Sequence, residues 1–288
     1  MLLPHDADRD PAVAGIRQAF ATNHLNQMQN EIEELIRRNP NDPEGYLWRG
    51  FLDLQRQDDY NAVRALRRAE ALDANVYVLK LLAVAYYSVR QFRLFVMTMN
   101  EAMQKQPGDF APYYYLGRYY VSVDAQEFAE AADYFKMAIR RNPRYFRSYY
   151  YFGYCNEIMR HLNTAEQQYR ESMKLARAAG ATSPLPYEGM ARLRLLENKP
   201  SDALVYARQS VQLAPQQAAS HKILAKAYTS AGRQKEASLE WKRTAALDLT
   251  DPSPYYHLFQ IYSALGNTIK ANAALAQFKK LSAIYGAD

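Results

Sequence analysis

Apolar residues recur every three or four positions along this chain, in blocks of about a dozen residues that short polar breaks separate. That spacing places the apolar side chains on one face of a helix, so each block predicts an amphipathic helix. The clearest pair of blocks carries Tyr113, Leu116, Gly117 and Tyr120 in the first block and Ala131, Phe135 and Ala138 in the second, with Pro143 after it. The small residues let two antiparallel helices approach closely, and the proline closes the pair, because it cannot continue a helix interior.

The same pair of blocks recurs along the chain at an almost constant interval. The aligned units start near residues 43, 76, 110, 146, 184, 218 and 252, so the spacings are 33, 34, 36, 38, 34 and 34 residues. The segment 10–42 has helix length and ends in a proline, and we interpret it as a degenerate first repeat or cap behind an N-terminal tail of residues 1–9. The pattern predicts an all-α chain of about eight helical hairpins, or about sixteen helices, without a sheet.

Turn residues fall between the two blocks of a unit. Gly232 and Gly266 stand where a left-handed residue would end the first helix, and Lys199-Pro200 is expected to do the same in its own unit. The longest insertion lies between residues 175 and 186, where an extended helix should precede a turn.

These motifs resemble the tetratricopeptide repeat family over residues 43–285, and more weakly from residue 10. The period of 34 residues, the small residues at fixed offsets and the closing prolines carry the resemblance. It implies a right-handed α-α superhelix. Members of the family are mostly adaptors, co-chaperones and assembly factors, which bind proteins or peptides in a concave groove. The resemblance therefore implies a scaffold that is not an enzyme.

In that family the second, fifth, ninth and twelfth positions of each first helix face the groove. Counting these positions gives a hypothetical partner-binding set of Tyr77, Lys80, Tyr114, Arg118, Arg147, Tyr150, Tyr154, Arg192, Lys222 and Lys226. Tyr256 falls on a groove position as well. Tyrosine and arginine are enriched at binding hot spots, so we expect a ligand with acidic and apolar side chains, bound most tightly between residues 76 and 183.

A structural alternative stays open for the aromatic residues. The chain has 24 tyrosines, and those on the first helices could pack between neighbouring helices and only stiffen the stack. A clamp for a C-terminal carboxylate, as in the co-chaperone members, is not expected. That clamp needs asparagine after lysine, whereas Val84 follows Lys80 and Lys226 follows Lys222 at a spacing of four.

The formal net charge of +6 raises the question of nucleic acid. Basic pairs recur late in the second blocks, at 37–38, 67–68, 140–141, 242–243 and 279–280. Cations near a helix C-terminus are stabilised by the helix dipole, which makes a nucleic-acid surface the less favoured explanation. Binding of RNA by a helical repeat array stays as the alternative function, and an accessory domain of an enzyme complex as a third.

No constellation of residues points to catalysis, a metal or a cofactor. The five histidines show no ligand spacing, and the single cysteine, Cys155, is expected to be a buried, inert thiol. The longest uncharged apolar stretch is too short to cross a membrane, and the first residues do not resemble a secretory signal. Cytoplasm is the default expectation, with an exported form and self-association left open.

Overall fold

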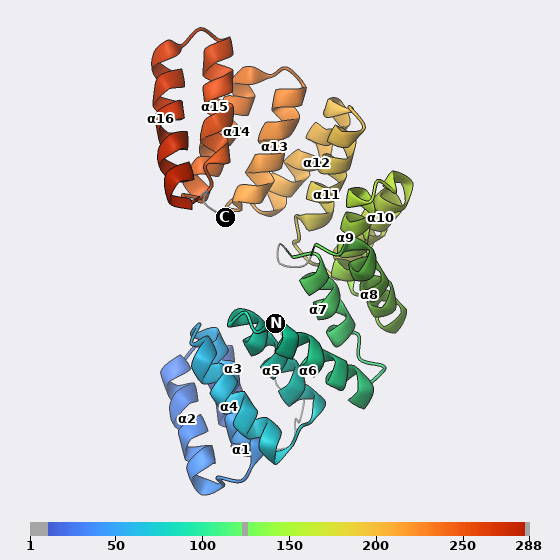
Figure 1. The fold of residues 1–288 in the computed structure, drawn as a ribbon, viewed down its shortest axis with the longest axis vertical. Coiled ribbons are helices and arrows are strands. Elements are labelled where there is room, and N and C mark those ends of the chain that lie inside the picture. Colours follow the sequence, from blue (N-terminus) through green and yellow to red (C-terminus); the bar gives the residue numbers. More distant parts are fainter. Residues whose placement is uncertain (1–10, 123–125, 286–288) are drawn as a thin grey trace. The chain divides into compact units, whose positions relative to one another are not determined.

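Regular turns divide the chain into helix pairs. The computed structural model describes residues 11–122 and 126–285, and these residues form sixteen α-helices and no strand (Figure 1). The all-α prediction is confirmed. The chain divides into two compact units, Met1–Leu116 and Gly117–Asp288, with the boundary inside one helix.

The helices of the first unit are α1 (Pro11–Ala21), α2 (Leu25–Arg38), α3 (Pro43–Gln55), α4 (Asp59–Leu72), α5 (Val76–Ser88) and α6 (Phe92–Lys105). Helix α7 (Ala111–Tyr120) contains the boundary. Within this unit α3 packs against α4, α4 against α5 and α5 against α6, so consecutive helices are neighbours.

The second unit contains α8 (Phe128–Arg141), α9 (Phe146–Ile158), α10 (Leu162–Ala178), α11 (Leu185–Leu196), α12 (Pro200–Leu213), α13 (Ala218–Ser230), α14 (Gln234–Leu247), α15 (Ser253–Ala264) and α16 (Thr268–Tyr285). From α8 to α16 each helix packs against the next, and first helices also meet, α9 with α11 and α11 with α13. We propose that each hairpin is one repeat unit with the starts given above.

A residue in the left-handed region lies between the two helices of every described hairpin. These residues are Asn23, Gln57, Arg90, Gln126, Arg160, Asn198, Gly232 and Gly266. In the seventh hairpin the amide of Arg233 donates to the carbonyl oxygen of Tyr228 at 2.9 Å, which closes a Schellman motif around Gly232. The expectation for Lys199-Pro200 needs correction. Asn198, with φ 57°, makes the turn, and Pro200 is the first residue of α12.

Large side chains on the second helices fit against glycines on the first helices. A Cβ on Gly153 of α9 would lie 2.9 Å from the ring of Tyr169, and a Cβ on Gly189 of α11 would lie 2.6 Å from the same ring. Tyr169 on α10 therefore sits between two first helices that approach it only because both residues lack a side chain. Phe135 on α8 has the same relation to Gly117, at 2.8 Å. These contacts set the spacing of the helices.

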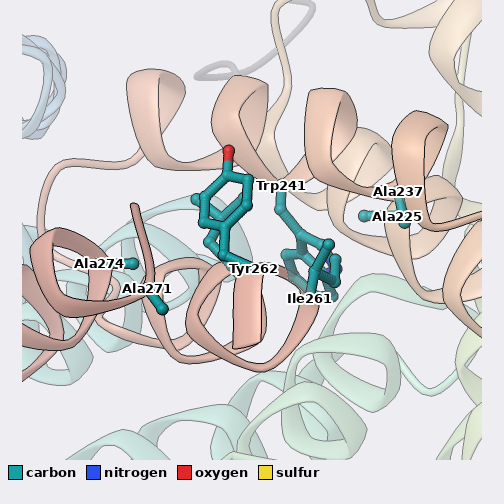
Figure 2. Packing of buried hydrophobic residues seen from close by; sticks show 8 residues of the cluster. Ala225, Ala237, Trp241, Ile261, Tyr262, Ala271 and Ala274 are labelled. Carbon is teal, nitrogen blue, oxygen red and sulfur yellow. The ribbon is translucent and has the colours of Figure 1, made fainter. Parts of the chain in front are cut away.

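Tryptophan takes this position near the C-terminus. Trp241 is fully buried in a cluster with Ala225, Ala237, Leu258, Ile261, Tyr262, Ala271 and Ala274. Figure 2 shows the indole between small alanines and the side chains of Ile261 and Tyr262. One large ring and several small residues thus fill the space between helices α13 to α16.

The helix ends correct one expectation about charge. Only the pairs Arg37-Arg38 and Arg140-Arg141 lie in the last turn of their helices. Helices α4, α14 and α16 continue for about a turn beyond their basic pairs. The helix dipole therefore accounts for two of the five pairs and leaves the basic character of the others unexplained.

We predict that Phe135→Ala lowers the free energy of unfolding by about 3–5 kcal/mol, because the fully buried ring leaves a cavity beside Gly117. Urea denaturation of the two proteins measures the difference. A variant as stable as the parent would contradict the placement of Phe135 between helices.

We predict opposite effects at two equivalent turns. Arg160→Gly should raise the free energy of unfolding by about 1 kcal/mol, because Arg160 holds φ at 64°, where a Cβ is strained. Gly232→Ala should lower the free energy of unfolding by about the same amount, since Gly232 has φ 72°. The control is Lys136→Gly inside α8, which should cost about 1 kcal/mol. If both turn variants changed the free energy of unfolding in the same direction, the explanation would be refuted.

Candidate partner-binding site

Lys80, predicted to face a ligand, instead joins two helices of the first unit. Its side chain is buried on α5, and Nζ lies 2.6 Å from Oδ2 of Asp109. The other oxygen of Asp109 accepts a hydrogen bond from the amide of Ala111, the first residue of α7, at 2.9 Å. Tyr77, which is half-buried, lies with its ring 4.6 Å from the same Nζ. The ammonium therefore ties the first helix of one hairpin to the capping residue of the next.

Lys222 repeats this arrangement in the second unit. Its Nζ lies 2.7 Å from Oδ2 of Asp251, which is again 29 residues further along the chain. Oδ1 of Asp251 accepts from the amide of Ser253, the first residue of α15, at 2.8 Å. Hydrogen bonds from Lys222 and Ser253 lower the pKa of Asp251 against the effect of its burial. Sequence reasoning missed both aspartates, although an aspartate close before a helix start often accepts a hydrogen bond from the first backbone amides.

Two of the predicted tyrosines are packing residues. Tyr114 is 3% exposed and Tyr150 is 7% exposed. The ring of Tyr150 lies 5.8 Å from that of Tyr169 and 4.9 Å from that of Tyr151. Neither tyrosine has the free area that a contact residue needs, so we do not propose them as ligand contacts. The prediction of one groove from residue 76 to 183 crosses the boundary between the units and stays a prediction.

A buried carboxylate organises the surface of the second unit. Glu157 on α9 is 2% exposed and accepts from Nε and Nη2 of Arg192 on α11, at 2.5 and 3.0 Å. The hydroxyl of Tyr169 donates to the same carboxylate at 2.6 Å. Burial raises the pKa of Tyr169, which keeps this hydroxyl protonated as a donor. Two charged groups and a phenol thus connect three helices.

The Arg192 side chain is partly exposed and lies beside an aromatic ring. The guanidinium carbon lies 5.1 Å from the ring centre of Tyr154, which is half-buried, and the Arg192 side chain is 32% exposed. A guanidinium held by three hydrogen bonds, two to Glu157 and one to the hydroxyl of Tyr169, and by a ring cannot reorient freely. Arg192 and Tyr154 therefore form a fixed part of the surface.

Lys226 is the unpaired cation of this region. It is exposed on α13 and, among the residues that the structure describes, has neither a hydrogen bond nor an ion pair. Partial desolvation lowers the pKa of Lys226, and the nearby cations of Lys222 and Arg192 lower it further, against the opposing effect of Asp251. We call Arg192, Lys222 and Lys226 the Lys226 cluster.

Two of the three cations of the Lys226 cluster have a carboxylate partner. Glu157 pairs with Arg192 and Asp251 pairs with Lys222, whereas no carboxylate forms an ion pair with Lys226 in the described residues. Glu188 is a third carboxyl group near Arg192. It accepts from Ser220 at 2.6 Å, and burial raises its pKa. Lys226 is therefore the member of the cluster whose ammonium has no bonded carboxylate in the described residues.

The remaining predicted residues of the second unit are two exposed arginines. Arg118 on α7 lies with its guanidinium carbon 4.6 Å from the ring centre of Tyr151, and that of Arg147 on α9 lies 5.8 Å from the ring centre of Phe146. Both present charge beside an aromatic ring, as Arg192 does.

The described residues contain no group of three or more histidine, cysteine or acidic side chains that could hold a metal ion. Cys155 is fully buried, and burial raises the pKa of its thiol to about 12, so it is a poor nucleophile. None of the helices in the described ranges combines the length and apolar character that a bilayer crossing needs.

Solved structures with the same succession of helix pairs identify the fold. The Cut9 protein of the Cut9-Hcn1 hetero-tetramer matches with a TM-score of 0.74 and 13% identity over 88% of this chain. A tetratricopeptide repeat protein from Parabacteroides merdae matches with a TM-score of 0.66 and 14% identity, over 87% of this chain and 97% of its own. The fold is that of a tetratricopeptide repeat solenoid.

Yeast Tom70 shares this tetratricopeptide fold, with a TM-score of 0.65 and 14% identity over 98% of this chain. The chain spans about half the length of the Cut9 chain, 50%, and 63% of the Tom70 chain. A scan of known protein families finds no match, and neither does a search of curated proteins. At such low identity the likeness shows the fold alone.

We predict that Glu157→Ala lowers the free energy of unfolding by about 3 kcal/mol, because it leaves the Arg192 charge and the buried Tyr169 hydroxyl without their acceptor. Urea denaturation measures the loss. Glu157→Gln keeps one acceptor oxygen and should lose less. The control is Glu171→Ala on α10, whose partner Lys174 is exposed, and which should change stability by less than about 0.5 kcal/mol. Equal losses from Glu157→Ala and the control would contradict the role of this network.

Proposed function

We propose that this chain is a protein-binding scaffold whose second unit takes an acidic segment of another protein at the Lys226 cluster. The observation that carries the proposal is that Lys226 lies near the cations of Lys222 and Arg192 and, in the described residues, has no carboxylate in an ion pair with it. Holding an ammonium there costs free energy, as the lowered pKa of Lys226 indicates. A carboxylate from a partner would offset that cost, so binding would relieve an unfavourable arrangement that folding alone leaves in place.

The rigidity of the neighbouring groups supports the proposal. Arg192 is held by Glu157 and lies against the ring of Tyr154, so little side-chain freedom remains to be lost on binding. The ring of Tyr154 adds apolar surface next to the charge, which suits a segment carrying both acidic and apolar side chains. Cut9 shares the fold and is found in a hetero-tetramer with Hcn1, which shows that this architecture is compatible with a partner chain.

RNA binding is the second candidate, favoured by the basic pairs that the helix dipole does not explain. An RNA-binding repeat would present bases to its side chains and rely on several phosphate contacts, with a steep dependence on salt. At the Lys226 cluster two of the three cations already have carboxylate partners. Such pairing leaves less charge for a phosphate backbone than for a single carboxylate.

Selection from a library of random peptides displayed on phage tests the proposal, with a fluorescent oligouridine as a parallel RNA probe. We expect enrichment of peptides with aspartate or glutamate, and loss of at least about tenfold in their affinity in Lys226→Glu, or about 1.4 kcal/mol. Lys235→Glu, an exposed lysine on the second helix of the same hairpin, is the control and should bind nearly as the parent does.

Two outcomes would contradict the proposal. Enriched peptides without acidic residues, or acidic peptides that bind Lys226→Glu at full strength, would remove the Lys226 cluster as the site. Salt-sensitive binding of oligouridine that Lys226→Glu weakens, without any peptide binding, would favour the RNA candidate instead.

A further inference from the structure

A pocket of about 450 Å³ lies on the first unit, lined by residues of α2, α3 and α4. Helix α3 packs against both of the other helices, so the pocket is part of one packed group. Three arginines line it, Arg49 on α3 and Arg64 and Arg68 on α4, together with one acidic residue, Asp53 on α3. Positive charge therefore exceeds negative charge in this lining.

Arg49 and Asp53 bind each other. Both carboxylate oxygens of Asp53 accept from Nε of Arg49, at 3.1 and 3.3 Å, and Nη1 of Arg49 lies 3.5 Å from Oε1 of Glu33 on α2. Burial raises the pKa of Asp53, against the effect of Arg49. Asp58, whose charge also raises the pKa of Asp53, accepts from Asn61 at 2.6 Å. Arg49 is thus held by carboxylates of the chain, and the acids around it have partners of their own.

Arg64 and Arg68 have no such partners. Both are exposed, and among the described residues neither forms a hydrogen bond or an ion pair. No acidic residue stands three or four positions from either of them on α4, where a helix would place an ion-pair partner. The guanidinium carbon of Arg68 lies 5.7 Å from the ring centre of Tyr46, another residue of the lining. Two like charges are therefore held one turn apart beside the pocket.

The second unit has a corresponding pocket, of about 490 Å³, lined by residues of α10, α11 and α12. These are again two second helices and the first helix between them in the sequence. Three residues of α12 line this pocket from the positions of three lining residues of α4, each 141 residues further along the chain. They are Asp202, Val205 and Tyr206, in the places of Asn61, Arg64 and Ala65. The two pockets thus belong to the same part of the repeat.

Every cation that lines the second pocket has a carboxylate partner within the chain. Arg194 bonds to Glu166 and, at 2.5 Å, to Glu197. Arg170 lies 2.6 Å from Glu166, and Lys199 lies 3.1 Å from Glu197. The repeat can therefore pair the charges of such a pocket, and the first unit does not do so for the two arginines of α4.

The two arginines favour one class of ligand. Residues four apart on a helix have Cβ atoms about 5–6 Å apart, so two guanidinium groups can hold one anion between them. Each guanidinium binds two oxygens as a fork. A carboxylate has two oxygens and one charge, which suits one fork. A phosphate monoester has three terminal oxygens and a charge close to about −2 at neutral pH, which suits two.

We propose that this pocket, the Arg64 pocket, binds a phosphate monoester through Arg64 and Arg68, with the organic part of the ligand against the ring of Tyr46 and the side chains of Ile36 and Ala65. The site lies in the first unit, so it does not depend on the proposed function of the second. It also gives a role to Arg68, whose basic pair the helix dipole does not explain. The other member of that pair, Arg67, is not among the lining residues.

The test titrates phenyl phosphate into protein whose arginines are labelled with ¹⁵N, and the Nε–H signals report each guanidinium. Methyl phenyl phosphate is the matched ligand, because it keeps the ring and the phosphorus but carries a single charge. Acetyl-Gly-Ser-phosphotyrosine-Ser-Gly-amide carries the same phenyl phosphate on a peptide. A tighter complex with the peptide would assign the site to a phosphorylated partner protein, and a tighter complex with phenyl phosphate to a small phosphorylated molecule.

We expect phenyl phosphate to shift the signals of Arg64 and Arg68 and to bind at least about fivefold more tightly than the diester. Arg64→Gln and Arg68→Gln should each weaken binding by at least about fivefold. Arg67→Gln removes the same charge from the adjacent, exposed residue outside the lining, and should bind within about twofold of the parent. The indole signal of Trp48, which is buried on α3 and donates to Glu44 at 2.9 Å, checks that each variant keeps the fold.

Unchanged signals of Arg64 and Arg68, equal binding of monoester and diester, or full binding by both variants would overturn the inference. Equal weakening by Arg67→Gln and Arg68→Gln would also overturn it, because it would show a response to net charge alone. Oligouridine that binds more tightly than phenyl phosphate, and that loses as much affinity in Arg67→Gln as in Arg68→Gln, would replace the pocket by a nucleic-acid surface.

Discussion

The close approach of helices around one large side chain is the constraint on which the rest of this structure depends. Tyr169 occupies space that a methyl group on Gly153 or Gly189 would take, and Phe135 has the same relation to Gly117. Because the ring touches first helices on both sides, it fixes the spacing within a hairpin and between hairpins. The same spacing brings Glu157 on α9 to Arg192 on α11, so the polar surface depends on the apolar packing.

The fold could be predicted from the sequence because its determinants are local and repeated. Small residues at fixed offsets, closing prolines and apolar positions three or four apart are visible without knowledge of distant contacts. The roles of the surface residues were harder to predict from the sequence. Counting helix positions treated Lys80 and Lys222 as ligand contacts, whereas each pairs with an aspartate 29 residues away. That pairing depends on where the following helix begins, which a count within one helix cannot reveal.

Lys226 differs from Lys80 and Lys222, the other lysines on groove positions, in its ion pairing. Lys80 and Lys222 each form an ion pair with an aspartate, whereas in the described residues Lys226 forms none and feels the neighbouring cations of Lys222 and Arg192, against the opposing effect of Asp251. The aromatic side chains divide in a similar way. Tyr114 and Tyr150 are buried in the packing, whereas Tyr154 retains exposed area beside Arg192 and Tyr256 is 42% exposed. The aromatic and basic residues thus divide into those that build the stack and those that keep exposed surface.

We propose that the ammonium group of Lys226 binds a carboxylate of a partner protein. Carbon-13 NMR of the lysine side chains measures its pKa directly, in the free protein and with a saturating acidic peptide, and Lys226→Gln identifies the signal. The account predicts a Lys226 pKa below that of a free lysine side chain in the protein alone, and a rise when the peptide binds, since a carboxylate favours the charged form. An ordinary pKa in the free protein that the bound peptide leaves unchanged would contradict it.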